Sequence, residues 1–544
     1  MSSLGRASAI LGAGTLVSRV TGLVRTIVLV AAIGSFGRPA DAFAVANQLP
    51  NNVFTIIQTG ILTAVIIPQI VKSATHSDGG RAYISKLFTL GTVVFLGATV
   101  LAMLLAPWLV VLYADKFTPD QLALGTAFAY WCLPQIFFYG LYALIGETLN
   151  AKRVFGPYTW TPVANNIISI IGFLVFIALF GGNQNQVDVW DPSMIAVLGG
   201  TATVGIALQG ALLLFAWKRT GLTLRPDFRW RGVGLGQVGS LAGWTFLMVI
   251  AGQIAGLIQT RVVTAASGDH PSTALMMAAW LVFMLPYSIF AISIGTPYFT
   301  QIAEHAAAQR DDEVRNDVAR CMRFVLLFVV GSGVALAVAA VPATRIFTED
   351  AAQAVQAAPV LICYLVGLVP LSLLFIVQRT FYAYGDTRTP FLFTLVQVAL
   401  IIGFSVLAGA LFGHTDEGLG QLAAAIALGQ SLAGIVQTVI AIWILRNRLG
   451  GLELPSTLMS LLRFAIAAIP AGFAGWGAFV LMGAGDGWTA GQTGSAFVDK
   501  MLGAMGTGVI GLVAVVVYAI VLIVIRAPEL ASARSLLARF LPSR

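Results

Sequence analysis

Residues 7–34 read ASAILGAGTLVSRVTGLVRTIVLVAAIG, a run long enough to cross a bilayer as one helix although it contains Arg19 and Arg25. Every other residue in this run is apolar, Gly, Ser or Thr. A cation at the centre of a spanning helix costs roughly 2.5–3.5 kcal/mol on insertion scales. Such a residue normally faces a polar cavity and meets an anion there. We therefore expect this first span to line a cavity for a negatively charged cargo.

The rest of the chain has the same apolar character. Of its 544 residues, 58% are apolar and 10% are charged, and the mean hydropathy is +0.88. Soluble globular proteins do not have this composition. Apolar runs of about 20–30 residues suit a ~30 Å hydrocarbon core, whereas a membrane barrel would show alternating segments of ~10 residues. We predict an all-α polytopic membrane protein with about 14 transmembrane helices. The predicted spans are residues 8–33, 40–71, 86–113, 121–149, 158–181, 194–217, 234–264, 273–302, 322–346, 353–383, 389–412, 417–445, 459–483 and 501–525.

The basic residues predict the orientation of the spans. With the N-terminus inside, 24 of the 31 Lys and Arg residues fall in cytoplasmic segments and 5 fall outside. This asymmetry places both termini in the cytoplasm. The net charge of +8 is thereby explained by topology, so we expect no nucleic-acid partner. Residues 304–323 carry charges at helical spacing and are predicted to form a helix at the membrane surface.

The chain contains an internal repeat. Pro286 follows Pro50 by 236 residues in similar contexts, and Pro390 follows Pro157 by 233 residues. Because six spans per repeat is an even number, both halves keep the same orientation, as in one common plan of secondary transporters. We predict an N-lobe at 1–217, a cytoplasmic linker at 218–233, a C-lobe at 234–446, two further spans at 447–526 and a basic cytoplasmic tail at 527–544.

The candidate binding residues begin with Arg19 and Arg25. On a straight helix they lie about 9 Å apart along the axis and about 120° apart in azimuth. Guanidinium offers a bidentate fork to phosphate, and Ser18 and Thr21 add hydroxyl groups, so we predict a phosphate or diphosphate site. The alternative is that one arginine reaches an interface while the other pairs with a carboxylate such as Asp41.

The second predicted span carries a dense set of polar residues. Asn51, Asn52 and Gln58 are interpreted as a cavity wall, and ordinary helix–helix hydrogen bonding is the alternative. Asp41 lies toward the outer end of this span and is a gate or structural candidate.

Further gate or structural candidates follow at Glu147, Asn150 and Arg379. Glu147 could relay a proton or an ion, or form an ion pair at the cytoplasmic end of its span. Arg379 occupies the repeat position of Glu147, which raises the hypothesis of a gate pair between the two halves.

The sequence predicts no cofactor, no metal site and no catalytic residue. The four histidines lie far apart. A GxGxxG string at residues 234–239 lacks a preceding strand and a βαβ unit. We therefore do not expect an enzyme.

Several motifs together resemble a known family. SRVTGLVR at 18–25, LPN at 49–51, LNAKRVFGP at 149–157 and FYAYGDTRTP at 381–390 are similar to the MurJ (MviN) lipid II flippases, in an actinobacterial-like form. That family belongs to the multidrug/oligosaccharidyl-lipid/polysaccharide exporter superfamily. The chain departs from the family's cationic pattern at Phe54, Thr55 and Leu281, so its cavity is expected to be less cationic.

The resemblance implies a transporter of the bacterial cytoplasmic (inner) membrane that serves peptidoglycan synthesis, cell wall biogenesis and cell shape. Two lobes would rock around a cationic cavity and carry lipid II, an undecaprenyl diphosphate-linked precursor, to the outer leaflet. Arg19 and Arg25 match diphosphate ligands of the family, and the last two spans would hold the lipid tail. Membrane lipids and cell-wall synthesis proteins are the other expected partners.

Other functions stay open at this point. An exporter of another lipid-linked oligosaccharide would use the same cavity, whereas a drug/cation antiporter should have an acidic one. A non-transporting scaffold for envelope synthesis would tolerate changes in the cavity but not in the loops. A polyprenyl glycosyltransferase should carry a catalytic carboxylate in a large outer loop, and the outer loops here are short.

Overall fold

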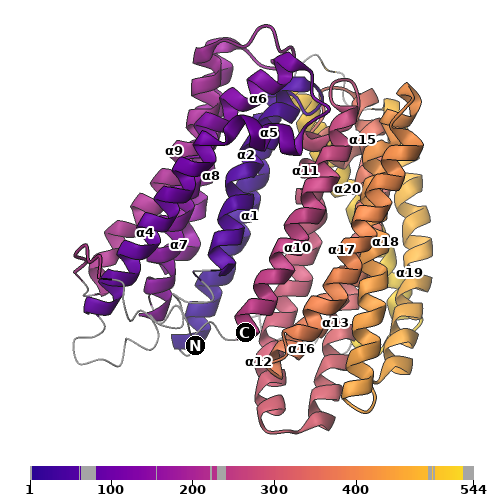
Figure 1. Ribbon diagram of the computed structural model, residues 1–544. Coiled ribbons are helices and arrows are strands. Elements are labelled where there is room, and N and C mark those ends of the chain that lie inside the picture. The colour runs from indigo at the N-terminus through magenta and orange to yellow at the C-terminus, as the bar shows by residue number, and fades with distance from the viewer. Residues whose placement is uncertain are drawn as a thin grey trace. The chain divides into compact units, whose positions relative to one another are not determined.

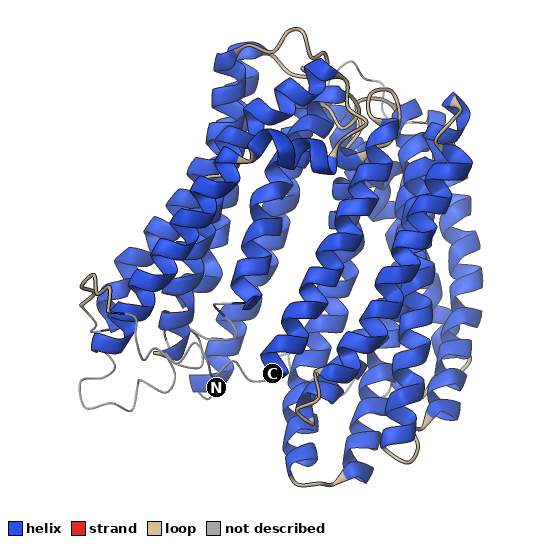
Figure 2. Ribbon diagram, viewed as in Figure 1, coloured by secondary structure: helices blue, strands red, loops and turns tan. Residues whose placement is uncertain are grey.

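The computed structural model describes residues 3–60, 62, 81–152, 154, 156–220, 223–229, 240–487, 493 and 496–530. This part of the chain is helical and contains no β-strand (Figure 2). Twelve of its helices are long and apolar enough to cross a membrane, and they correspond to predicted spans 3–14. The first two predicted spans are helical as well, and the part of span 2 at 61 and 63–71 lies outside the described residues. The predicted all-α membrane fold is confirmed.

The helices divide into two compact units, Met1–Ala274 and Leu275–Arg544. Figure 1 labels most of them. The first unit contains α1 (Ser3–Ile33), α2 (Arg38–Ile57), α4 (Arg81–Leu104), α5 (Ala106–Tyr113), α6 (Pro119–Cys132), α7 (Gln135–Ala151), α8 (Gly156–Phe180), α9 (Pro192–Trp217), η2 (Lys218–Thr220), α10 (Ser240–Val263) and η4 (Thr264–Ala266). The second contains α11 (Thr273–Pro286, whose first two residues belong to the first unit), the π-helix η5 (Tyr287–Ile292), α12 (Ser293–Ala307), α13 (Asp311–Val338), α14 (Ala340–Arg345), α15 (Ala351–Val366), α16 (Leu368–Ala383), α17 (Arg388–Phe412), α18 (Asp416–Arg448), α19 (Leu454–Leu481), η6 (Ala484–Asp486) and α20 (Ala496–Val524).

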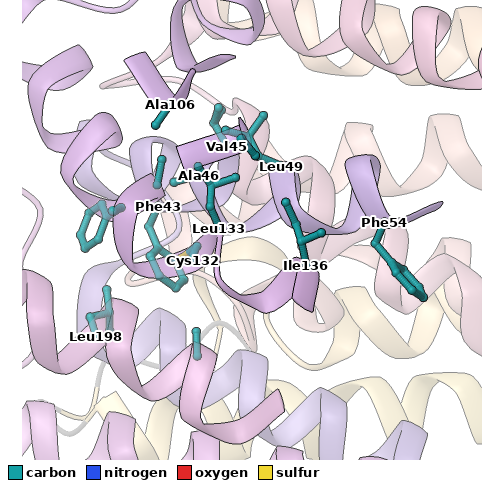
Figure 3. Packing of buried hydrophobic residues seen from close by; sticks show 14 of the residues in the cluster. Phe43, Val45, Ala46, Leu49, Phe54, Ala106, Cys132, Leu133, Ile136 and Leu198 are labelled. Carbon is teal, nitrogen blue, oxygen red and sulfur yellow. The ribbon is translucent and has the colours of Figure 1, made fainter. Parts of the chain in front are cut away.

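The core of the first unit is built from α2, α6, α7 and their neighbours (Figure 3). Phe43 meets Phe128 edge to face, with ring centroids 5.3 Å apart. Glycine lets the helices approach closely: a Cβ atom on Gly140 would lie 2.2 Å from the Phe95 ring. In lipid, helices associate through such van der Waals contacts because the hydrocarbon around them is equally apolar. This tight packing gives α2 a firm support.

Several predicted spans are interrupted. Predicted span 4 is divided between α6 and α7, and predicted span 10 between α15 and α16. The first break falls at Pro134, which lacks a backbone N–H and so cannot continue the helical hydrogen bonds. The second falls at Gly367. The sequence repeat pairs these two spans, and both are broken near their middle.

Residues 304–323 are helical, as predicted, but do not form a separate surface helix. They comprise the end of α12 and the beginning of α13, joined by a turn at residues 308–310. The two spanning helices are therefore longer than their apolar cores, because charged residues extend each helix past the hydrophobic part.

Helix α10, the first helix of the predicted C-lobe, packs within the first unit. It contacts α2 and α5. At its last turn the Arg261 guanidinium lies 2.7 Å from the Asp115 carboxylate, which follows α5. The boundary between the compact units thus falls at Ala274, and the lobe boundaries read from the sequence stay a prediction.

Candidate functional site

The two arginines lie on α1, which is one continuous helix through Gly22. Both side chains are half-buried. Among the described residues neither guanidinium forms an ion pair, so the predicted alternative of a pair with Asp41 is not what the structure contains. Arg25 lies within electrostatic range of the Tyr139 hydroxyl on α7. Two cations in an apolar helix that have no carboxylate partner in the part of the chain that the structure describes favour binding of an external anion.

The two residues predicted to add hydroxyl groups to the site, Ser18 and Thr21, both contact the neighbouring helix α8. Thr21 Oγ1 donates to the Val17 carbonyl at 2.8 Å. It accepts a hydrogen bond from Asn166 Nδ2 on α8 at 3.0 Å, and the same amide nitrogen lies 3.0 Å from the Ser18 carbonyl. Ser18 therefore takes part through its backbone. The role of Asn166 was not predicted, because nothing in a helical pattern says which neighbouring helix an amide reaches.

The residues predicted on α2 have different surroundings. Asn52 is buried and its Nδ2 donates to the Tyr113 hydroxyl at 3.1 Å, which is a helix–helix contact. Asn51 is exposed, and its carbonyl accepts from Thr55 Oγ1 at 2.7 Å. Gln58 lies where α2 passes into a π-helical stretch, and its side chain is half-buried. A role for Asn51 and Gln58 in binding stays a prediction, whereas the environment of Asn52 favours a packing role.

Asp41 joins two segments that are distant in the sequence. Its Oδ2 accepts from Ser267 Oγ at 2.7 Å, and its Oδ1 accepts from the Ala274 backbone N–H at 2.9 Å. Gln121 adds a bond from its Nε2 to Ser267 Oγ at 2.7 Å. Asp41 is 2% exposed. These bonds hold the connection that follows α10 against α2 and α6, which is the structural role considered for this residue.

The remaining gate candidates lie in separate units. On α7, the Glu147 side chain is hydrogen-bonded to Asn150. On α16, the exposed Arg379 guanidinium lies 5.3 Å from the Phe299 ring centroid and 5.2 Å from that of Phe375. Aromatic faces attract a guanidinium in this geometry. The gate pair between Glu147 and Arg379 stays a prediction.

The second unit contains a buried charged cluster that was not predicted from the sequence. Arg345 is 1% exposed and pairs with Asp499 at 3.1 Å, while Lys500 Nζ lies 3.3 Å from the Thr348 carbonyl. From the sequence, Arg345 and Lys500 are two of the five basic residues that the predicted topology places outside. The adjacent opposite charges at 499 and 500, at the start of a long apolar run, were the available signal.

Comparison with known proteins identifies relatives of the chain. The family model described as "Lipid II flippase MurJ" matches residues 30–487. A probable lipid II flippase MurJ of Haemophilus influenzae is 27% identical over 72% of this chain and 79% of its own length. The corresponding protein of Synechocystis is 25% identical over 88% of both chains.

The solved structures that match share the fold. A lipid II flippase MurJ in an inward closed conformation has a TM-score of 0.69 and 18% identity, covering 94% of this chain and 98% of that one. An inward-facing multidrug resistance MATE family transporter of the MOP superfamily has a TM-score of 0.58 and 13% identity, covering 79% of this chain and 98% of that one. The family is one of transporters rather than enzymes. The model match over most of its length shows that the chain belongs to the lipid II flippase MurJ family.

Proposed function

We propose that this chain moves lipid II from the inner to the outer leaflet of the bacterial cytoplasmic membrane by alternating access. The observation that carries the proposal is a pair of guanidinium groups, on the first helix of a family member, that have no carboxylate partner among the described residues. A disaccharide-peptide headgroup cannot cross hydrocarbon unaided, because its polar groups would lose water without replacement. A polar, cationic environment replaces that water and attracts the diphosphate.

In this proposal Arg19 and Arg25 bind the diphosphate, which all polyprenyl diphosphate-linked sugars share. Guanidinium forms two parallel hydrogen bonds to phosphate oxygens, so each arginine contributes charge and orientation. A hydrogen bond to a charged group is worth about 1.5–3 kcal/mol, so losing one arginine should weaken binding roughly 10- to 100-fold. The membrane lipids around the spans and cell-wall synthesis proteins are the further partners we propose.

The orientation of the termini belongs to the proposal too. The excess of Lys and Arg in alternate loops supports both termini in the cytoplasm. Labelling of single cysteines placed near either end, with a reagent that does not cross the membrane, tests this point.

The test of function replaces a bacterium's own lipid II flippase with this chain. After depletion of the resident protein, we expect the chain to restore growth and to prevent accumulation of lipid II in the inner leaflet. The Arg19→Gln/Arg25→Gln double variant should insert normally and fail on both counts. The matched control is Arg229→Gln/Arg310→Gln, which removes two exposed arginines outside the spans. A normal amount of lipid II in the outer leaflet of cells that carry Arg19→Gln/Arg25→Gln would refute the assignment of the binding site to these arginines.

A further inference from the structure

Asn166 reaches α1 between the two arginines. Its Nδ2 atom lies 3.0 Å from both the Ser18 carbonyl and Thr21 Oγ1, and the residue is 6% exposed. A primary amide nitrogen carries two N–H donors, so both are used in these contacts. Because Thr21 donates its own hydroxyl proton to backbone carbonyls, its oxygen is free to accept from Asn166. Both donors of the amide are therefore used, and the contact between the two helices at this level is directional.

These contacts define which face of α1 meets α8. Ser18, Thr21 and Arg25 follow the i, i+3, i+7 spacing of one helix face, and Arg19 lies about 100° away from Ser18. Val20 is 52% exposed and lies about 160° from Ser18, and Val24 is 40% exposed and lies about 120° from Ser18. Apolar side chains of this kind tolerate sliding and rotation, since dispersion contacts have no preferred direction. The amide bridge is a directional contact at this level of the helix.

Rotation of α1 controls where the guanidinium groups lie. A head group about 6 Å from the helix axis moves by about 2 Å when the helix turns by about 20°. A shift of that size breaks a hydrogen bond of ordinary length. Two arginines about 120° apart can contact one diphosphate only at a restricted set of helix rotations.

We propose that Asn166 is a positioning residue for anion binding. It fixes the rotation of α1 so that the Arg19 and Arg25 guanidinium groups can bind the same diphosphate. The inference rests on the proposed function, because it needs the arginines to bind the anion. It assigns Asn166 no contact with the substrate. A Cβ atom built at Gly22 would lie 3.6 Å from Asn166 Nδ2, an ordinary van der Waals contact, so the amide lies beside the turn of α1 between the two arginines.

The test compares Asn166→Leu with Ser169→Ala in the full-length protein. Leucine nearly matches asparagine in shape and removes both donors. Ser169 is the control because it is buried on the same helix and its hydroxyl contacts Asn165, which is also on α8. Binding of lipid II and of undecaprenyl diphosphate to the purified protein is measured, together with thermal unfolding. We expect Asn166→Leu to weaken binding of both probes on the order of tenfold, with Ser169→Ala unchanged.

A double-mutant cycle separates positioning from general damage. In the Arg19→Gln/Arg25→Gln background, Asn166→Leu should weaken binding no further, because there are no guanidinium groups left to position. An equal further loss in that background, or wild-type affinity of Asn166→Leu alone, would overturn the inference while leaving the arginine site intact. Wild-type affinity of the double arginine variant would instead overturn both the proposed site and this inference.

Thr21→Val provides a second variant if Asn166→Leu unfolds. It removes one of the two acceptors and keeps the Ser18 carbonyl in place. We expect a smaller loss of affinity, again dependent on the arginines. Unchanged affinity in a stably folded Thr21→Val, together with unfolding of Asn166→Leu at the growth temperature, would assign Asn166 a purely structural role and reject the proposal.

Discussion

Arg345 and Asp499 form an ion pair of 3.1 Å in which the arginine is 1% exposed. The guanidinium also donates to the Thr348 carbonyl at 2.7 Å, and Asp499 accepts from Thr493 Oγ1 at 2.7 Å. Arg345 ends α14 and Asp499 lies in the first turn of α20. The pair therefore fastens the last spanning helix to the body of the second unit.

Breaking this pair should destabilise the protein strongly. Arg345→Met leaves the Asp499 carboxylate buried without its cation, and removing one partner of a buried pair costs about 3–5 kcal/mol. We expect a clear fall in the thermal unfolding temperature of the solubilised protein. The double variant Arg345→Met/Asp499→Leu should recover part of the loss, since no buried charge of this pair remains. A double variant less stable than either single one would contradict the fastening role of the pair.

Lysine should substitute poorly for the arginines of α1. Lysine keeps the positive charge but offers a point charge in place of the planar fork. We expect Arg19→Lys and Arg25→Lys to bind lipid II more weakly than the wild type and more tightly than the corresponding glutamine variants. The measurement is the affinity of each purified variant. Equal affinities of the lysine and glutamine variants would show that positive charge alone contributes nothing at these positions and would contradict the expected order.

The contacts of Asp41 predict that the backbone amides of the segment after α10 are protected from hydrogen exchange. Its carboxylate accepts from the Ala274 N–H and from Ser267 Oγ, so Asp41→Ala leaves both donors without this partner. A lost buried hydrogen-bond partner costs about 1–3 kcal/mol. We expect faster amide hydrogen exchange across residues 267–275, with exchange in α18 unchanged. Ser267→Ala should have a smaller effect in the same direction, and an unaltered exchange pattern in Asp41→Ala would rule out the anchoring role.

Asp386 makes part of the stability depend on pH. Desolvation alone would raise its pKa, but hydrogen bonds from Thr389 and the Arg448 guanidinium at 2.6 Å together hold the pKa below its ordinary value. A lowered pKa stabilises the folded state above the unfolded-state value of about 3.9. The contribution is lost as the pH falls below about 4 and through the folded-state pKa.

The measurement for Asp386 is the unfolding temperature at pH 7, 5 and 3. We expect the difference between wild type and Asp386→Asn to be constant from pH 7 to 5 and to shrink at pH 3. The control is Asp416→Asn, the same substitution at an exposed carboxylate on another helix, α18. A difference that grows on acidification would mean that folding raises the pKa of Asp386 instead of lowering it.

The sequence by itself determined the fold class, and it predicts that the two arginines lie within the first span. A backbone in hydrocarbon must satisfy its hydrogen bonds locally, so the apolar run lengths identify spanning helices without knowledge of their neighbours. The length of the first apolar run likewise predicts that Arg19 and Arg25 lie within the first span. The sequence also placed charged residues 304–323 in a helix, although it could not tell a surface helix from the ends of two spans.

Only the tertiary structure decided which polar groups meet. Asp41 and Ser267 are 226 residues apart, Asn166 and Thr21 are 145 apart, and Arg345 and Asp499 are 154 apart. The cost of leaving a polar group unpaired requires that each of them find a partner. Any suitable partner avoids that cost, so the cost does not select one partner over another. The partner is selected by how the helices pack, through close contacts such as the one at Gly140. The sequence therefore identifies polar residues within the spans, and the packing of helices assigns each one its role.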